Sequence, residues 1–219
     1  MKTKGIISAL SAILFLALIF VVRTVDVAPI GPEQTRIGLS AINDSVRAFF
    51  GVNMTLNTIT NHIGNAAILT AAFFAFVGLY QWIRRKNMFR VDCEILLLGV
   101  AFLCAIGSYF LFENVIVNYR PILMPDGTGP EASFPSSHTM TVCVVLGCVY
   151  VLLNSYIRKK GLLWFLRAVC LVGIAAIVAM RLISGVHWFS DIVGGMLLSM
   201  ALIFGYAYFL DLVKSHIRA

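Results

Sequence analysis

The apolar residues of this chain fall into six long runs that short polar segments separate. Each run has close to the ~20 mostly apolar residues that a helix needs to cross a bilayer. The expected spans are Gly5–Val22, Asn65–Ile83, Glu94–Phe112, Thr139–Ile157, Leu162–Met180 and Ile192–Val213. The pattern predicts an all-α integral membrane protein with six transmembrane helices in one bundle. We expect a single domain over residues 1–219, with a motif-bearing core at roughly 94–213.

Basic residues gather at every second boundary between these runs. The groups are Lys2 with Lys4, residues 84–90, residues 158–160, and Lys214 with Arg218. All four groups fall on one side of the membrane if the six spans alternate in direction. Because short cytoplasmic segments carry an excess of Lys and Arg, we expect both termini in the cytoplasm. The expected location is the plasma membrane, with the remaining loops on its outer face.

The first apolar run has a second interpretation, as a cleaved signal peptide. Lys2 and Lys4 would then form its positively charged start. However, the run exceeds the ~7–15 residues of a signal-peptide core, and no clear A-x-A cleavage site follows it. We therefore expect a retained helix, and the orientation of the other five spans is the same either way.

The longest polar region, residues 23–64, contains apolar residues at near-helical spacing. They are Ile37, Leu39, Ile42, Val46, Phe49 and Phe50, with Arg36, Asp44 and Arg47 between them. This spacing predicts an amphipathic helix on the outer side. It either lies in the membrane interface or caps the bundle.

The composition excludes a soluble protein. Hydrophobic residues make up 60% of the chain and charged residues 12%, and the mean hydropathy is +0.91. A soluble domain of this length needs far more charge on its surface. The net charge of +7 is spread in small clusters between apolar runs, so we expect membrane lipids and no nucleic acid as partners. The five cysteines show neither a disulfide framework nor a zinc-binding spacing.

Three polar stretches end hydrophobic segments on the expected outer side: Tyr119–Pro121, Pro135–His138 and Arg181–Asp191. Together they supply two arginines, two histidines, a carboxylate and two hydroxyl groups, a set that suits phosphoryl transfer without a metal. The planar guanidinium groups of Arg120 and Arg181 match phosphate oxygens two at a time. Either arginine alone fits a snorkelling side chain equally well, but two beside two histidines favour a phosphate site.

His187 and Asp191 are four residues apart, so they share one face of a helix. Asp191 can accept a hydrogen bond from one imidazole nitrogen and leave the other basic, as carboxylates do in catalytic triads. Such a histidine can attack phosphorus and form a phosphohistidine. The alternative, an aspartate that favours the helix dipole, explains Asp191 but leaves His187 unexplained.

The stretch from Pro135 to His138 has the signals of a helix start. Free backbone N–H groups at such a start favour an anion, and the hydroxyl groups of Ser136 and Ser137 add donors. His138 can then give a proton to the departing lipid oxygen. Ordinary serine capping remains the alternative. The other two histidines, His62 and His216, have no convergent partners in the sequence.

The order Arg-Pro, Pro-Ser-x-His and Arg-x5-His-x3-Asp resembles the type 2 phosphatidic acid phosphatase superfamily, over roughly residues 113–195. The resemblance implies that His187 is the nucleophile, Asp191 its orienting carboxylate and His138 the general acid. It also implies that Arg120, Arg181 and Ser136 bind the phosphate. The phosphatases of this superfamily use no metal, and we expect no cofactor.

Three positions depart from the family pattern. The lysine that usually lies seven residues before the first arginine is replaced by Glu113. Ser137 replaces a glycine, and Met180 replaces a serine. Of these, the change at Glu113 has the largest expected effect, because it replaces a phosphate contact with a carboxylate. It can pair with an arginine, bind an amine-bearing headgroup, or lower activity.

The expected function is a membrane lipid phosphatase that acts through a phosphohistidine intermediate. Candidate substrates are phosphatidic acid, phosphatidylglycerol phosphate and an isoprenyl diphosphate, which the phosphate-contacting residues do not distinguish. Two alternatives stay open. One is a phosphotransferase that passes the phosphoryl group to a lipid, and the other is a non-catalytic lipid-binding or transport protein on the same fold.

Overall fold

The structure is a computed structural model that describes residues 1–125 and 127–218, without the side chains of residues 217 and 218. Six of its helices are long and apolar enough to cross a membrane. They are α1 (Lys2–Thr24), α3 (Met54–Arg85), α4 (Cys93–Asn114), α5 (Ser137–Tyr156), α6 (Lys160–Ser184) and α7 (Phe189–Arg218). The prediction of an all-α membrane protein with six spanning helices is therefore confirmed.

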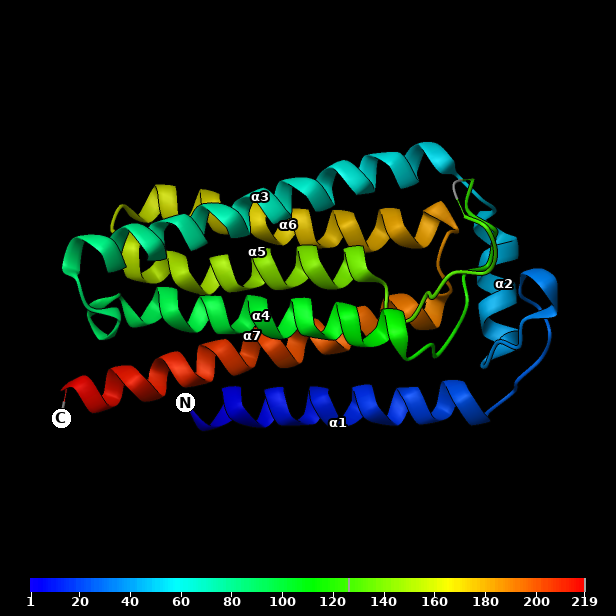
Figure 1. Ribbon diagram of the computed structural model, residues 1–219, viewed down its shortest axis with the longest axis horizontal. Helices are drawn as coiled ribbons and strands as arrows, with labels where there is room; N and C mark the ends of the chain where they lie inside the picture. Colours follow the sequence, from blue (N-terminus) through cyan, green and yellow to red (C-terminus); the bar gives the residue numbers. More distant parts are fainter. Residues whose placement is uncertain (126, 219) are drawn as a thin grey trace.

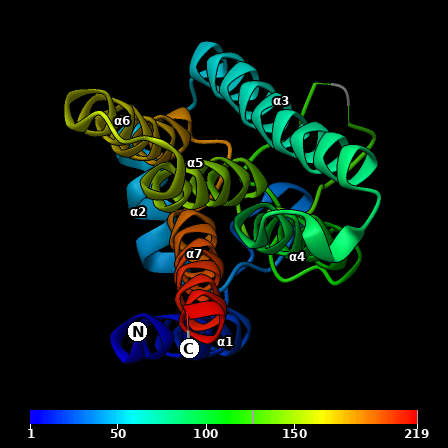
Figure 2. The same ribbon diagram turned by 90° about the vertical axis from the view of Figure 1, so that its left-hand side faces the viewer.

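Helix α5 lies at the centre of the bundle, surrounded by α3, α4, α6 and α7 (Figures 1 and 2). One face of α5 buries Met140, Val144 and Cys148 against α4 and α7. Its opposite face packs against α3 and α6. Helix α1 lies at the edge of the bundle, where it packs along α7 (Figure 2). Because of this central position, α5 is the most buried of the six spans.

The connections of the bundle divide between its two ends (Figure 1). Both termini lie at one end, together with the short turns after α3 and α5. The first of these turns contains a short 3-10 helix, Met88–Arg90. The opposite end holds the loop after α4, the loop after α6 and the region after α1. The three motif stretches therefore meet at one end, and the basic segments lie at the other.

The orientation of this bundle in the membrane is a prediction that cysteine labelling can check. We expect Gly127→Cys to react with a membrane-impermeant thiol reagent in intact cells, because Gly127 lies in the loop after α4. Lys159→Cys should stay unlabelled until the cells are permeabilised, since its turn carries the basic cluster that favours the cytoplasm. The parent chain supplies the background labelling of its own cysteines. Labelling of Lys159→Cys alone in intact cells would contradict the predicted orientation.

Helix α3 begins at Met54, well before the expected start at Asn65. The Asn53 side chain caps it by accepting a hydrogen bond from the Leu56 N–H at 3.0 Å. The sequence from Met54 to Asn65 contains several polar residues, and for this reason hydropathy alone predicts a loop there. In the structure two of these polar side chains, Asn57 and Thr60, are buried in the bundle, so helix formation there follows from tertiary contacts.

The amphipathic helix expected in the outer region is present as α2 (Ser40–Phe50), after a 3-10 helix, Pro32–Gln34. Helix α2 lies across the end of the bundle that holds the three motif stretches (Figure 1). Its buried Asn43 accepts a hydrogen bond from the Ser190 N–H at 3.0 Å and donates to Ser190 Oγ at 3.0 Å. Through these bonds α2 caps the start of α7. Phe49, at the other end of α2, is exposed.

Candidate active site

Two loops carry the motif residues, and hydrogen bonds join them. The loop after α4 folds back on itself, because the Arg120 N–H donates to the Glu131 carbonyl at 2.9 Å. The Ser136 N–H donates to the backbone carbonyl of Asp191 at 3.0 Å. From the loop after α6, the indole N–H of Trp188 donates to the Tyr119 carbonyl at 2.7 Å. The two loops therefore form one unit at the N-terminal ends of α5 and α7.

His187 is the most tightly held group of this unit, with 4% of its surface exposed. Its Nδ1 lies 3.1 Å from the backbone carbonyl oxygen of Ser133. Because a carbonyl oxygen can only accept, this contact assigns the proton to Nδ1. The other ring nitrogen, Nε2, then carries a lone pair, and it lies 3.3 Å from Nη1 of Arg120. The basic nitrogen of His187 therefore faces a phosphate-binding type of side chain.

The surroundings of His187 also keep its imidazole neutral. Burial lowers the pKa of His187 well below its ordinary value, and the positive charges of Arg181 and Arg120 lower it further. A neutral imidazole is the form that can act as a nucleophile or base. The geometry and the charge of this site thus favour the same protonation state.

Asp191 holds His187 less directly than its spacing predicted. The distance from Asp191 Oδ2 to Nδ1 of His187 is 3.7 Å, too long for a hydrogen bond. The Ser133 hydroxyl lies between them: it donates to Asp191 Oδ2, and its oxygen is 3.0 Å from Nδ1. Asp191 also accepts a bond from the Trp188 N–H at 2.9 Å. The carboxylate therefore fixes two groups: the Ser133 hydroxyl, which contacts the ring, and the backbone turn that carries His187.

Removal of the Ser133 hydroxyl should weaken the site without abolishing it. We expect Ser133→Ala to lower kcat about 10- to 100-fold, because the backbone carbonyl still holds Nδ1 while Asp191 loses its donor. Ser45→Ala, which removes an exposed hydroxyl group of α2 outside both hollows, is the matched comparison. Phosphate release by both purified variants measures the effect. Equal, parent-like rates for both would contradict a positioning role for Ser133.

Arg181 and Arg120 differ in their burial and in the partners of their guanidinium groups. Arg181, with 1% of its surface exposed, donates from Nη1 to Asn57 Oδ1 at 2.7 Å and to Thr60 Oγ1 at 2.9 Å. Its Nε has no hydrogen-bond partner among the described residues. Arg120 is half-buried, and its Nε lies 3.1 Å from a carboxylate oxygen of Glu131. Arg181 is therefore fixed by α3 with its Nε donor free, whereas Nε of Arg120 is paired with a carboxylate.

The start of α5 supplies the third part of the site. Ser136 is its buried N-cap residue, and its Oγ accepts a hydrogen bond from the Thr139 hydroxyl at 3.0 Å. The first N–H groups of a helix have no partner within the helix, and they favour an anion. His138 lies in this first turn, and its Nδ1 has no hydrogen-bond partner in the described part of the chain.

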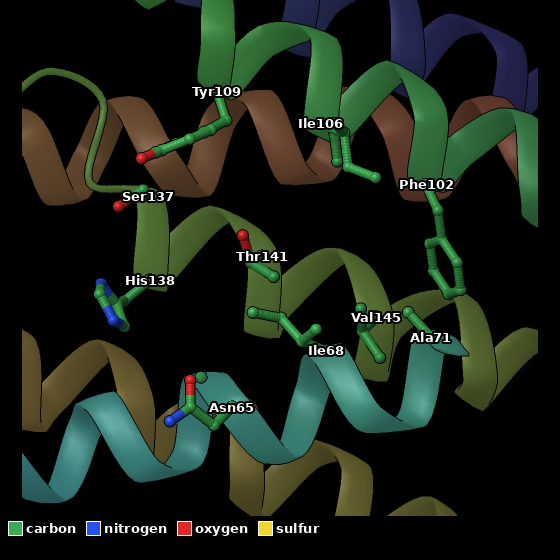
Figure 3. Close-up of a pocket in the computed structure, with 12 residues that line it drawn as sticks. Asn65, Ile68, Ala71, Phe102, Ile106, Tyr109, Ser137, His138, Thr141 and Val145 are labelled. Atoms are coloured by element: carbon green, nitrogen blue, oxygen red, sulfur yellow. The ribbon is translucent and has the colours of Figure 1, made fainter. Parts of the chain in front are cut away.

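Two hollows meet at this helix start. A narrow one is lined by Arg120, Ser133 and His187, among others. A larger cavity of about 380 Å³ lies between α3, α4 and α5, with apolar walls that include Ile68, Phe102 and Val145 (Figure 3). His138 lies at the polar end of this cavity, and Tyr109 and Ser137 line both hollows. A polar, arginine-bearing pocket therefore adjoins an apolar one across Ser137.

Glu113 lies near the end of α4 and lines the narrow hollow with Arg120 and His187. It is exposed, and no described residue forms an ion pair with it. The arginine partner that the sequence offered for it is instead bound to Glu131. The site thus places one unpaired carboxylate at its rim and a second, paired carboxylate on Arg120.

Comparisons with known proteins bear out the resemblance that the motifs carry. Residues 114–214, a little under half of the chain, match the model of the PAP2 superfamily. The matched segment contains His138, His187 and both arginines, and it excludes α1, α2 and α3. No curated protein matches the sequence significantly.

Two solved structures are similar to this protein. One is described as the first transmembrane PAP2 type phosphatidylglycerolphosphate phosphatase from Bacillus subtilis. It has a TM-score of 0.65 and 18% identity, and the match covers 94% of this chain and 96% of that chain. This likeness establishes the shared fold. The other is LpxE from Aquifex aeolicus, with a TM-score of 0.41, 21% identity and coverage of 76% and 90%.

Several residues that contact the site were not anticipated from the sequence. They are Ser133, Asn57, Thr60, Asn118 and Asn43, all of them buried and polar. Asn57 and Thr60 had a usable signal, because polar residues three apart, followed by a glycine at 64, form one stripe on a helix. Ser133 had none, since a serine in a loop is common and its partner is distant in the sequence.

Proposed function

We propose that this protein is a membrane lipid phosphatase of the PAP2 kind that hydrolyses a phosphate or diphosphate monoester of a lipid. One observation carries the proposal. A buried, neutral His187 presents its basic Nε2 to Arg120 in a polar hollow, and across Ser137 this hollow adjoins an apolar cavity whose polar end holds His138. A lipid phosphate has this same division into a charged end and an apolar end.

In the first step, Nε2 of His187 attacks the phosphorus atom, and the bond from phosphorus to the lipid oxygen breaks. Protonated His138 gives its proton to that oxygen, so the lipid leaves as an alcohol or as a lipid monophosphate. Arg120, Arg181 and the first N–H groups of α5 hold the phosphate oxygens, with Ser136 and Ser137 as further donors. Arg120 can do so while its Nε stays paired with Glu131, because Nη1 faces His187 and is free of that carboxylate.

In the second step, water attacks the phosphohistidine and the bond from phosphorus to Nε2 breaks. His138, now neutral, takes the proton from this water and returns to its starting state. Inorganic phosphate is released, and His187 is again neutral with its proton on Nδ1. No cofactor is needed for this balance, and we propose that none is used.

The lipid part of the substrate is proposed to lie in the cavity between α3, α4 and α5. Burial of apolar chain there contributes about 25 cal/mol per Å². Phosphatidic acid, phosphatidylglycerol phosphate and an isoprenyl diphosphate all fit this division, and the second is what the description of the Bacillus subtilis structure names. With the basic segments in the cytoplasm, the site faces the outer side of the plasma membrane.

Phosphate release from these three lipids by the purified protein tests the proposal. Hydrolysis of at least one of them, lost in His187→Ala, is the expected result. Transfer of the phosphoryl group to an added lipid in place of water would establish the phosphotransferase alternative. Binding of a lipid phosphate without any turnover would overturn the enzyme proposal in favour of a lipid-binding protein.

Glu113 should set substrate preference more than rate. A carboxylate near a phosphate site repels the substrate, by several kcal/mol at ~4 Å where screening is weak. We expect Glu113→Lys to change KM or the order of preferred lipids, and Glu113→Gln to retain turnover. Steady-state kinetics on the three lipids provide the measurement. Parent-like behaviour of both variants on every lipid would place Glu113 outside the functional site.

A further inference from the structure

We infer that the outer half of α3 positions the proton donor, and that Gly64 does so by leaving room for the ring of His138. The inference rests on the proposed role of His138. Helix α3 precedes the segment that matches the PAP2 model, so nothing in the motifs points to it. It is nevertheless the helix towards which the His138 ring is turned (Figure 3).

The contact at Gly64 is unusually close. A Cβ atom added at Gly64 would lie 2.8 Å from Cδ2 of His138 and 3.4 Å from its Nε2. Real Cβ atoms essentially never approach another atom to 2.8 Å, so any side chain at position 64 must displace the ring. The backbone of α3 therefore forms one wall of the space that the imidazole occupies.

Packing is the main constraint on this imidazole. Its Nδ1 has no hydrogen-bond partner among the described residues, in contrast to Nδ1 of His187, which lies 3.1 Å from the Ser133 carbonyl. A ring without such a bond depends on steric contact for its orientation. A small displacement at Gly64 is thus sufficient to turn it away from the leaving oxygen.

The same face of α3 also holds Arg181. Asn57, Thr60 and Gly64 are separated by three and four residues, so they lie on one stripe of the helix. Asn57 and Thr60 accept hydrogen bonds from Nη1 of Arg181, at 2.7 and 2.9 Å. Along two turns, α3 therefore contacts a phosphate-binding group and the proton donor, and it fixes the distance between them.

The test compares Gly64→Ala with Gly78→Ala, which adds the same methyl group to the same helix far from the site. At Gly78 the added Cβ would meet a methyl group of Ile95 at 3.1 Å. A misplacement of ~1 Å can cost about 100-fold in rate. We expect Gly64→Ala to slow hydrolysis of a short-chain alkyl phosphate about 10- to 100-fold. An aryl phosphate, which needs little protonation to leave, should be affected far less, and Gly78→Ala should match the parent on both.

A double-mutant cycle with His138→Ala separates this positioning role from a general packing effect. If Gly64 acts through His138, then Gly64→Ala causes no further loss of rate when His138 is already alanine. Additive losses, or equal losses on both substrates, would overturn the inference. A narrowed lipid cavity would give the additive result, because it does not depend on the ring.

Thermal unfolding of the same four proteins gives a readout that does not need activity. We expect Gly64→Ala to lower the Tm of the parent but not that of His138→Ala. If Gly64→Ala fails to fold while Gly64→Ala/His138→Ala folds, the methyl group clashes with the ring, as inferred. If neither folds, the contact lies elsewhere and the inference is wrong. A parent without turnover would refute the proposed function, and the cycle in Tm would still decide the contact.

Discussion

Replacement of His187 by alanine should lower the rate of phosphate release at least about 10⁴-fold with any lipid substrate. Removal of a nucleophile from other covalent enzymes has effects of this size or larger. Here the reason is specific, because Nε2 of His187 is the basic nitrogen that faces Arg120, and the methyl group of alanine offers no second one. Water would have to attack the substrate directly in the variant.

The matched control for this experiment is His62→Ala. His62 is exposed on α3 and lies outside both hollows of the site. It should retain the parent rate. Brief incubation with labelled substrate followed by alkaline denaturation should trap a phosphoprotein in the parent and in His62→Ala, and none in His187→Ala. Undiminished turnover by a folded His187→Ala protein would refute the covalent mechanism.

Replacement of Arg181 by alanine has the second largest expected effect. A fixed charged donor at the transferring phosphoryl group contributes about 10²- to 10³-fold. Arg181 meets this description because α3 holds its Nη1 at two points while Nε stays without a partner in the described chain. We expect kcat/KM to fall by that factor, and inorganic phosphate to inhibit more weakly, since both depend on the same donors.

Arg181→Lys refines this experiment, because it keeps the charge and loses the planar fork. We expect it to recover less than a tenth of the activity that Arg181→Ala loses. Arg167→Ala is the matched control: Arg167 lies on the same helix, where it is bonded to Asn154 near the other end of the bundle. Parent-like kcat/KM in a folded Arg181→Ala protein would exclude Arg181 from the site.

Hydropathy was sufficient to predict the six spans, because a bilayer demands about 20 apolar residues of every helix that crosses it. The start of α3 was not predictable in this way. Polar residues such as Asn57 and Thr60 favour the prediction of a loop. Their helical state depends on burial against Arg181, which lies more than 120 positions away in the sequence.

The candidate residues of the site could be named from the motifs, but the expectation that His187 and Asp191 share a helix face is wrong, because His187 lies in the loop before α7 begins at Phe189. Their bonds could not be named from the motifs. His187 and Asp191 are four apart and do lie close, but Nδ1–H of the ring donates its hydrogen bond to the backbone carbonyl of Ser133 in another loop. No local rule predicts that loop, because its path is set by pairing with Asn118 and by the start of α5.

The long α3 has a consequence for judging variants of this chain. A reader who checks only the motif residues would regard an exchange at position 57, 60 or 64 as a change in an ordinary membrane anchor. The contacts to Arg181 and His138 connect these three positions to the two side chains that are proposed to bind the phosphate and donate the proton. Two natural chains with identical motifs can therefore differ widely in rate because of substitutions in α3, a helix that a comparison of the motifs alone does not include.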